Sequence, residues 1–528
     1  MKLHGKNNIN YLNNLIFIAY CYSQIGNRDK STNTFVEYFD GLSDIIKDNL
    51  LGLKQTYKKE YWNKYAYAYK ILYPKYCIDN IDNEKAISKF YDISLLSKGI
   101  LLNTTIMQNH MHNSPEKQNT NISKWQDVQN CLDDSTVAIE FQEIIYDENN
   151  TQYCALVLRK DYNSPKLIPL FSLNEYHNIP KDSLYNSLKI YNLIWKPLET
   201  EIKNVKKIYF APDGIIHNIA IESAYLGENS YMSDQYNIYR LSSTREIVKK
   251  QSDKKNNTVV LYGGLKYDTS PEELIQANIE NSSKQSSTDY FAERPFVEER
   301  GSINYLEGSK KEVLDIEKII QTTNKTTLYT DQYGTEESFK NLTGSEINIL
   351  HISTHGYFYS ENNVYSQLYQ NTLDENASLE DKALTRSGLY LAGANNFLTN
   401  KSIPRNMEDG LLSAYEISKL NLKNLDLVVL SACQTGLGEI MGDGVFGLQR
   451  GFKIAGAKSI IMSLWKVNDL STQMMMTEFY RNYCLGLSKH HALLNAQKYI
   501  REFSDEDGNK IFKDPYYWAG FILLDAII

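Results

Sequence analysis

The sequence has few cysteines and no long apolar segment, and each shortage excludes a class of protein. Six cysteines are scattered over 528 residues without a CxxC pair. We therefore expect free thiols in a reducing compartment rather than a disulfide framework. Thiols and imidazoles never cluster at the spacing of a zinc site, so no metal is expected. No GxxxxGK[ST] loop occurs, and no cofactor is expected.

Positive charge is also in short supply. The chain has 56 Lys and Arg against 64 Asp and Glu, for a net charge of −8. This balance argues against broad nucleic-acid binding, which requires a basic face. The apolar stretch at residues 15–20 is too short for a signal peptide or a membrane span. We therefore expect a cytoplasmic protein that binds neither nucleic acid nor membrane.

Residues 1–124 have a helical pattern, because apolar residues recur at spacings of three and four. Residues 15–39 resemble one tetratricopeptide repeat, in which Ala19 is the small residue, Gly26 the turn glycine and Phe35 a packing aromatic. One repeat cannot bury its own face, so neighbouring helices must stack on it. Residues 61–76 are expected to form such a helix, ended by Pro74. A plain helical bundle is the alternative.

After a polar linker at 113–122 the pattern changes to that of an α/β protein. Apolar strands are predicted within residues 135–144, 206–214, 347–356, 427–430 and 457–465, with helical stretches between them. Such alternation predicts a mostly parallel sheet flanked by helices. Two polar insertions are expected, at 266–303 and at about 360–382, and the first is expected to be partly disordered.

Two of the predicted strands end in reactive side chains. One runs into His355 and Gly356, and the other ends at Cys433. Parallel strands bring their carboxyl ends to one edge of a sheet, which would place the imidazole beside the thiol. A histidine can take the proton of a thiol and make it a nucleophile. The amides of Gly356 and Cys433 could then hold an oxyanion.

The alternative for both residues is a place in the apolar core, where lone Cys and His side chains are common. Their matching positions at the strand ends make a dyad as well supported as two core positions. Cys484, in a helical pattern, is expected to be a core residue. His490 and His491, at a helix start, are expected to be solvated.

Several segments then resemble the CHAT domain, a caspase-like family related to separase and found joined to tetratricopeptide repeats. The segments are LHISTHGYF (350–358), DGLLSAYEI (409–417), LVVLSACQTGLGE (427–439) and DPYYWAGFILL (514–524), with VAIEF (137–141) upstream. The resemblance covers about residues 125–528. It implies a caspase-like, mostly parallel sheet after a helical, tetratricopeptide-like region at 1–124. Residues 125–265 would form the front part of the domain and 266–528 the catalytic part.

The resemblance also implies a cysteine peptidase with a His–Cys dyad. His355 matches the general base and Cys433 the nucleophile, with the amides of Gly356 and Cys433 as oxyanion donors. Relatives that cut after basic residues have an acidic side chain in the specificity pocket. Asp469 is the candidate here, although Lys466 departs from the separase pattern. Asp443 is a second candidate, whose alternative is a solvated turn residue.

Three functions remain open. The first is a regulated cysteine endopeptidase that cleaves protein substrates, with the helical N-terminus binding a partner or controlling the site. The second is a catalytically silent scaffold that acts through its helical repeats. The third is non-proteolytic thiol chemistry, such as acyl transfer.

Overall fold

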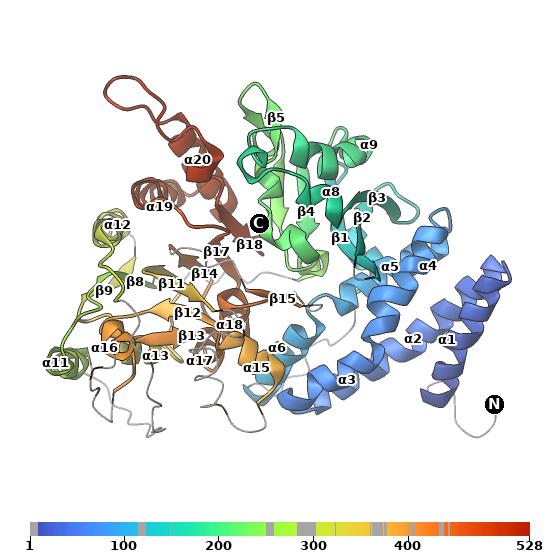
Figure 1. Ribbon diagram of the computed structural model, residues 1–528, viewed down its shortest axis with the longest axis horizontal. Coiled ribbons are helices and arrows are strands. Elements are labelled where there is room, and N and C mark those ends of the chain that lie inside the picture. Colours follow the sequence, from blue (N-terminus) through green and yellow to red (C-terminus); the bar gives the residue numbers. More distant parts are fainter. Residues whose placement is uncertain are drawn as a thin grey trace.

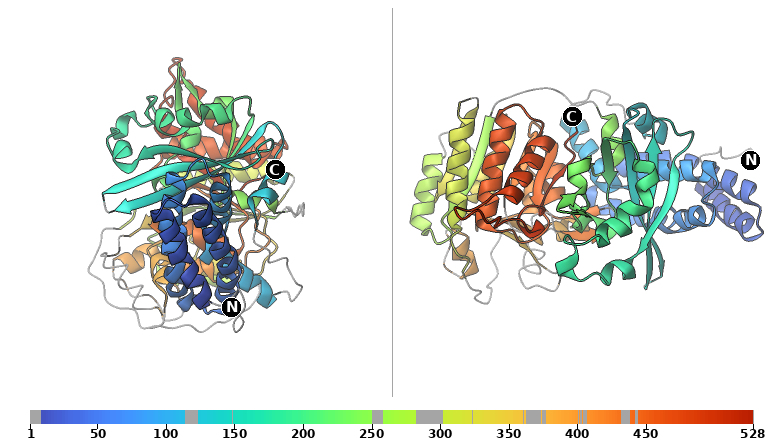
Figure 2. Two further views of the ribbon diagram at one scale, coloured as in Figure 1. Left: turned by 90° about the vertical axis from the view of Figure 1, so that its right-hand side faces the viewer. Right: turned by 90° about the horizontal axis from the view of Figure 1, so that it is seen from above.

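The computed structural model describes residues 9–113, 123–147, 149–249, 258–281, 302–322, 324–359, 361, 373, 377–399, 401, 403, 407–431, 438–441 and 444–527. A helical region lies at one end of the molecule and a large sheet with its helices forms the rest (Figures 1 and 2). The two predicted insertions fall largely outside the described residues. Within the first, residues Pro271–Asn281 form helix α11, so that part of the insertion is ordered.

The N-terminal region is helical, as predicted. It contains α1 (Ile9–Gln24), α2 (Arg28–Gly52), α3 (Gln55–Tyr67), α4 (Tyr73–Asp79), α5 (Glu84–Ser97) and α6 (Ile100–Asn113). The repeat-like segment forms the α1–α2 hairpin. Gly26 makes the turn at a φ of +74°, which favours glycine. Ala19 and Phe35 are buried between the helices, and the Ser31 hydroxyl donates to the Ala19 carbonyl at 2.8 Å.

The prediction that Pro74 ends its helix is wrong. The helix continues from α3 through a π-helical segment, Ala68–Leu72, into α4, which contains Pro74 in its first turn. Within this segment the Tyr73 amide donates to the Ala68 carbonyl, five residues back. The wider turn restarts the helix just before the proline. Pro74 then occupies a position at which a missing N–H costs no helical bond.

One sheet of eleven strands organises the rest of the described chain. Its order is β3-β2-β1-β4-β7-β18-β17-β14-β10-β8-β9. The strands are β1 (Thr136–Asp147), β2 (Asn150–Arg159), β3 (Lys166–Ser172), β4 (Lys207–Ala211), β7 (Asn237–Arg240), β8 (Thr258–Leu265), β9 (Lys325–Asp331), β10 (Ile349–Ser353), β14 (Leu427–Leu430), β17 (Ser459–Ser463) and β18 (Phe521–Leu524). Only the pairs β1–β2, β2–β3 and β17–β18 are antiparallel. The predicted mostly parallel sheet is confirmed.

Helices cover both faces of the sheet around β10 and β14. On one face lie α12 (Glu307–Ile320), α19 (Asp469–Cys484) and α20 (Lys489–Glu502) (Figure 1). On the other lie α13 (Glu336–Lys340), α17 (Ala414–Ser418), α18 (Leu448–Ala455) and a small sheet of β11 (Gly356–Phe358), β12 (Ser387–Tyr390) and β13 (Leu411–Ser413). Because both faces are covered, β10 and β14 are buried along their whole length and are mainly apolar rather than alternating.

The predicted front and catalytic parts share this one sheet. Strand β18, near the C-terminus, lies between them: it runs antiparallel to β17 and pairs in parallel with β7 through Leu524 and Arg240. The remaining short elements are α7 (Trp125–Asn130), α8 (Leu173–His177), α9 (Glu199–Ile202), α10 (Met232–Gln235), α15 (Leu379–Leu384), α16 (Ala394–Leu398), β5 (Tyr225–Gly227), β6 (Ser230–Tyr231), β15 (Glu439–Met441) and β16 (Gly444–Phe446). The boundary at residue 265 stays a prediction.

Two minor predictions are wrong. Cys484 is exposed rather than in the core, because it is the last residue of α19. His490 is buried rather than solvated: its ring stacks on Tyr239 with 3.9 Å between centroids. Burial lowers the His490 pKa to about 3.

None of the described helices combines the length and apolar character needed to cross a membrane.

Candidate active site

The two strand ends singled out by the sequence are neighbours. Strands β10 and β14 pair in parallel, with Ile352 opposite Leu430. The Ser431 amide extends this pairing by donating to the Ile352 carbonyl at 2.9 Å. The chain therefore enters the Cys433 segment at the edge of the sheet where His355 stands. Cys433 itself, like Asp443, lies outside the described residues.

A pocket opens at this edge between the ends of α12 and α19. Counted out to its mouth it has a volume of about 320 Å³. Its walls include His355, Ser431, Gly308, Glu312, Asp469 and Thr472. Helix α12 and the start of α19 each provide one wall, and the ends of β10 and β14 provide a third side.

His355 is held in a defined orientation. Its Nε2 lies 3.0 Å from the backbone carbonyl oxygen of Asn304. A carbonyl only accepts hydrogen bonds, so Nε2 must carry the proton that it donates. In a neutral ring the other nitrogen, Nδ1, is then the proton acceptor. The ring nitrogen that points away from Asn304 is therefore the one left free to accept a proton.

The Asn304 carbonyl is in turn positioned by Asn395 in α16, a residue that the sequence reasoning did not single out. The Ile303 amide donates to Asn395 Oδ1 at 2.9 Å, and Asn395 Nδ2 donates to the Ile303 carbonyl at 3.0 Å. Asn395 is fully buried, and its own amide donates to the Tyr267 carbonyl. The Tyr267 hydroxyl accepts from the His355 amide at 3.4 Å. One buried side chain thus fixes the segment against which the imidazole rests.

Gly356 follows His355 directly and is the first residue of β11. It pairs with Leu389 of β12, and the Tyr390 amide donates to the His355 carbonyl at 2.9 Å. The small sheet therefore fixes the backbone at His355 and Gly356. The oxyanion role of the Gly356 amide stays a prediction.

Asp469 lies in the same pocket as His355, at its rim. It is the exposed first residue of α19, and it faces Gly308 of α12 so closely that a Cβ there would lie 3.5 Å from the Asp469 Cβ. Desolvation and then the charge of Glu312 raise the Asp469 pKa, while His355 and Lys466 oppose the shift. The specificity role of Asp469 stays a prediction.

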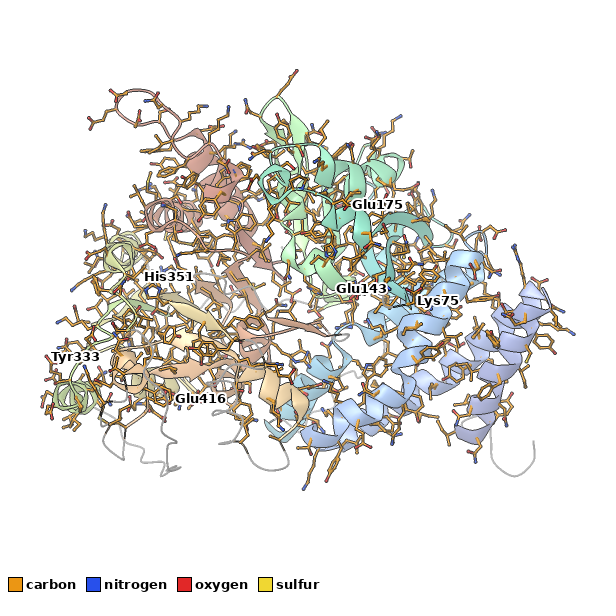
Figure 3. All side chains as sticks on the ribbon, in the orientation of Figure 1. Lys75, Glu143, Glu175, Tyr333, His351 and Glu416 are labelled. Atoms are coloured by element: carbon orange, nitrogen blue, oxygen red, sulfur yellow. The ribbon has the colours of Figure 1, made fainter. Side chains whose placement is uncertain are left out.

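A second acidic residue, which the sequence reasoning missed, lies deeper in the pocket. Glu312 of α12 is 2% exposed, and its Oε1 is 2.8 Å from His351 Nε2 on β10. His351 lies where α12 and α19 cover the sheet (Figure 3). The amphipathic pattern of α12 contained the signal: Ser309, Glu312, Val313 and Ile316 fall on one face, and that face is buried.

The comparisons with known proteins agree with this geometry. The family model of the CHAT domain matches residues 187–526. The chain belongs to the CHAT family. The resemblance seen in the sequence motifs is thereby confirmed over most of its extent.

The individual proteins that this CHAT protein resembles share only a short segment or a low sequence identity with it. Human tetratricopeptide repeat protein 28 is 34% identical over 120 residues, which are 23% of this chain and 5% of that protein. The chain thus spans about a twentieth of that relative's length. Among solved structures, the Saccharomyces cerevisiae separase–securin complex has a TM-score of 0.43 at 10% identity, covering 94% of this chain and 37% of that one. The Arg-specific cysteine proteinase gingipain R has a TM-score of 0.35 at 10% identity, covering 64% and 67%.

One carboxylate cluster of the CHAT protein lies away from the pocket. Glu336, Glu408 and Glu416 bring carboxylate oxygens within 4.8 Å of one another. The Lys340 ammonium forms ion pairs with all three, at 2.8, 2.8 and 2.9 Å. Glu416 marks this cluster in Figure 3. A lysine thus sits where a metal ion would bind, and the cluster is a structural ion-pair network.

Proposed function

We propose that this CHAT protein is a cysteine endopeptidase in which His355 activates Cys433. The proposal rests above all on one observation: His355 and Ser431, two residues before Cys433, line the same pocket at the edge of the sheet. The family and the tautomer of His355 support it. We place the enzyme in the cytoplasm, where its described cysteines, all free thiols, would stay reduced.

The chemistry would proceed by acyl transfer. His355 Nδ1 takes the proton of the Cys433 thiol, and the thiolate attacks the scissile carbonyl carbon of a protein substrate. The amides of Gly356 and Cys433 stabilise the oxyanion of the tetrahedral intermediate, a contribution of about 3–4 kcal/mol for each donor. The imidazolium then protonates the leaving amine. Water, deprotonated by the same imidazole, hydrolyses the thioester and regenerates the thiol.

The helical N-terminus would regulate this site through α18, the helix that follows the Cys433 segment. Lys58 of α3 is fully buried, and it lies close to the Glu380–Arg450 ion pair between α15 and α18. Gln55 Nε2 also donates to Glu380 Oε2 at 3.2 Å. A protein partner that moves the helices would therefore change contacts to α18. We propose an activating protein of this kind as the partner.

The test compares wild type with Cys433→Ala on a mixed peptide library, with and without host-cell extract as a source of activator. Cys484→Ala is the matched control, because Cys484 is an exposed cysteine on α19 that forms no disulfide. We expect wild type and Cys484→Ala to cleave and Cys433→Ala to be inactive but folded. Equal cleavage by wild type and Cys433→Ala would refute the dyad. If Cys433 does not react with iodoacetamide and no peptide is cleaved, the catalytically silent scaffold is favoured instead.

A further inference from the structure

A second pocket lies where the helical region meets the sheet and α18. Counted out to its mouth it has a volume of about 750 Å³, more than twice that of the pocket beside His355. Its lining comes from the helical region, from the ends of β4 and β7, and from α18 with side chains of β17 and β18. Strands β4 and β7 pair in parallel, so the pocket lies at the carboxyl ends of two neighbouring strands. Ligands of open α/β sheets commonly bind at such strand ends.

The described lining of this second pocket carries an excess of positive charge. Five of its side chains are cationic, and its one carboxylate is that of Asp213. The cations come from the helical region, from β7 and the loop after it, and from α18, and they are Lys70, Lys98, Arg240, Arg245 and Arg450. The glutamates that pair with three of them, Glu140, Glu222 and Glu380, lie outside the lining. A cleft lined mainly by one sign of charge concentrates counter-ions, so an anion is the expected ligand.

Several polar groups of the lining are available to bind such an anion. The half-buried Lys70 ammonium forms no ion pair or hydrogen bond among the described residues. Arg245 donates to two backbone carbonyls at the end of α5, and a guanidinium has five N–H donors, so others remain for a ligand. The side chains of Ser242 and Gln449 make no hydrogen bond within the part of the chain that the structure describes. These donors approach the pocket from the helical region, from the loop after β7 and from α18.

Two helices also begin at this pocket. Helices α6 and α18 contact each other (Figure 1), and their first turns contribute Leu102, Asn103, Gln449 and Arg450 to the lining. Neither first turn contains an acidic residue, and no side chain caps α18, whose N-cap is Gly447. The amides of a first helical turn have no partner within the helix, and the helix dipole favours negative charge there. Both helix starts therefore add to the attraction that the cations provide.

We propose that this second pocket binds a phosphate or diphosphate group of a small molecule, which joins the helical region to α18. Lys70 and Arg245 bind the phosphate oxygens on one side, and Gln449 with the first-turn amides of α18 binds them on the other. Phosphate fits better than carboxylate because the donors come from three regions. A phosphate group presents oxygens in several directions, whereas the two oxygens of a carboxylate lie in one plane.

This site is separate from the proposed catalytic chemistry. None of its described lining residues lines the pocket beside His355. Binding can therefore be measured whether or not a peptide is cleaved, and the failure of one proposal leaves the other standing.

Inorganic pyrophosphate is the probe for this site. Pyrophosphate and succinate, a dicarboxylate, are titrated separately into the full-length wild-type protein by calorimetry, at one ionic strength and without divalent cations. We expect pyrophosphate to bind at least tenfold more tightly than succinate. The melting temperature should also rise with pyrophosphate concentration, because a ligand of the folded state stabilises it. Equal binding of the two anions, or no binding of pyrophosphate, would overturn the proposal.

Lys70→Met tests the pocket from the helical region. It should weaken pyrophosphate binding about 10- to 100-fold, the usual effect of losing a charged hydrogen bond. The free protein should keep its melting temperature, because Lys70 forms no ion pair among the described residues. Lys64→Met is the matched control, since it makes the same change at an exposed lysine of α3 outside the lining, and its affinity should stay within twofold of wild type. Equal weakening in both variants would show non-specific attraction and refute the site.

Two more variants test the pocket from its other sides. Gln449→Leu removes an amide on α18 without changing the charge and should weaken pyrophosphate about 3- to 10-fold. Asp213→Asn should strengthen pyrophosphate binding, because it neutralises the one carboxylate of the described lining. Damage to the fold would not produce such a gain. If Lys70→Met and Gln449→Leu both leave the affinity unchanged, or if Asp213→Asn weakens binding, the anion lies elsewhere and the proposal is wrong.

Discussion

Asn395→Ala is the substitution that best tests how the base is positioned. Asn395 makes two hydrogen bonds to the backbone of Ile303, and the next residue, Asn304, accepts from His355 Nε2. Alanine at 395 removes both bonds and frees the segment that carries the Asn304 carbonyl. His355 would then lose the contact that fixes its tautomer, although no catalytic group has been altered.

The expected size of the effect follows from these contacts. Two lost hydrogen bonds at about 1 kcal/mol each lower the free energy of unfolding by about 2 kcal/mol. For metal-binding histidines, loss of the partner that orients the ring typically costs about 10- to 100-fold in activity, and we take the same range for His355. We therefore expect kcat/KM to fall by that factor in a protein that remains folded. The fall should lie in kcat, because Asn395 does not line the pocket.

The control is Asn396→Ala. Asn396 is the next residue of α16 and is also buried, but its side chain donates to the Thr269 carbonyl at 2.8 Å instead of to Ile303. The assay is peptide cleavage together with the pH dependence of Cys433 alkylation. In Asn395→Ala the alkylation midpoint should move towards about 8.5, the value of a free thiol. If both variants lose equal activity and share the wild-type midpoint, the Asn304 carbonyl does not orient the base.

Three further outcomes are expected. Desolvation lowers the pKa of Lys58 from 10.5 to about 8, so between these pH values the unfolded chain binds more protons and wild type becomes more stable as the pH rises. Denaturation between pH 7.5 and 10 should therefore show a smaller increase in the free energy of unfolding for Lys58→Met than for wild type. An equal increase would contradict the assignment. Gly308→Ala should leave KM for a cleaved peptide nearly unchanged, because its Cβ would make only ordinary contacts, whereas Gly308→Leu should raise KM by blocking the pocket. Equal KM values for the two variants in steady-state kinetics would contradict this. A chelator should not change the melting temperature, and a melting temperature that falls with the chelator would indicate a bound metal. Lys340→Met should lower the free energy of unfolding by about 3 kcal/mol, because three carboxylates lose their cation.

Sequence periodicity was sufficient for the elements that define the site. The apolar runs ending at Ser353 and Leu430 were recognisable as buried strands, and parallel pairing followed from their alternation with helices. The N-terminal helical pattern was equally clear. These features depend on local spacing, which a single sequence displays directly.

Features that depend on distant partners could not be predicted. Strand β18 has no sequence signal for its place between β7 and β17, because strand order is decided by packing of the whole sheet. The Asn304 carbonyl is a backbone group, so no residue type marks it. The helix continues past Pro74 because of a π-helical turn, which residue spacing alone does not predict. Glu312, by contrast, could have been predicted to be a buried acidic residue, since it lies on the apolar face of an amphipathic helix.

The stretch from residue 302 to residue 312 connects the two halves of the proposed mechanism. Asn304 accepts from the base, Gly308 forms the pocket wall opposite Asp469, and Glu312 forms its inner end. These three positions lie on one short segment held at its start by Asn395 and along its helix by contacts to α19. A substrate group that enters this pocket therefore contacts the same segment that orients His355. Glu312→Gln is accordingly expected to alter KM and kcat together.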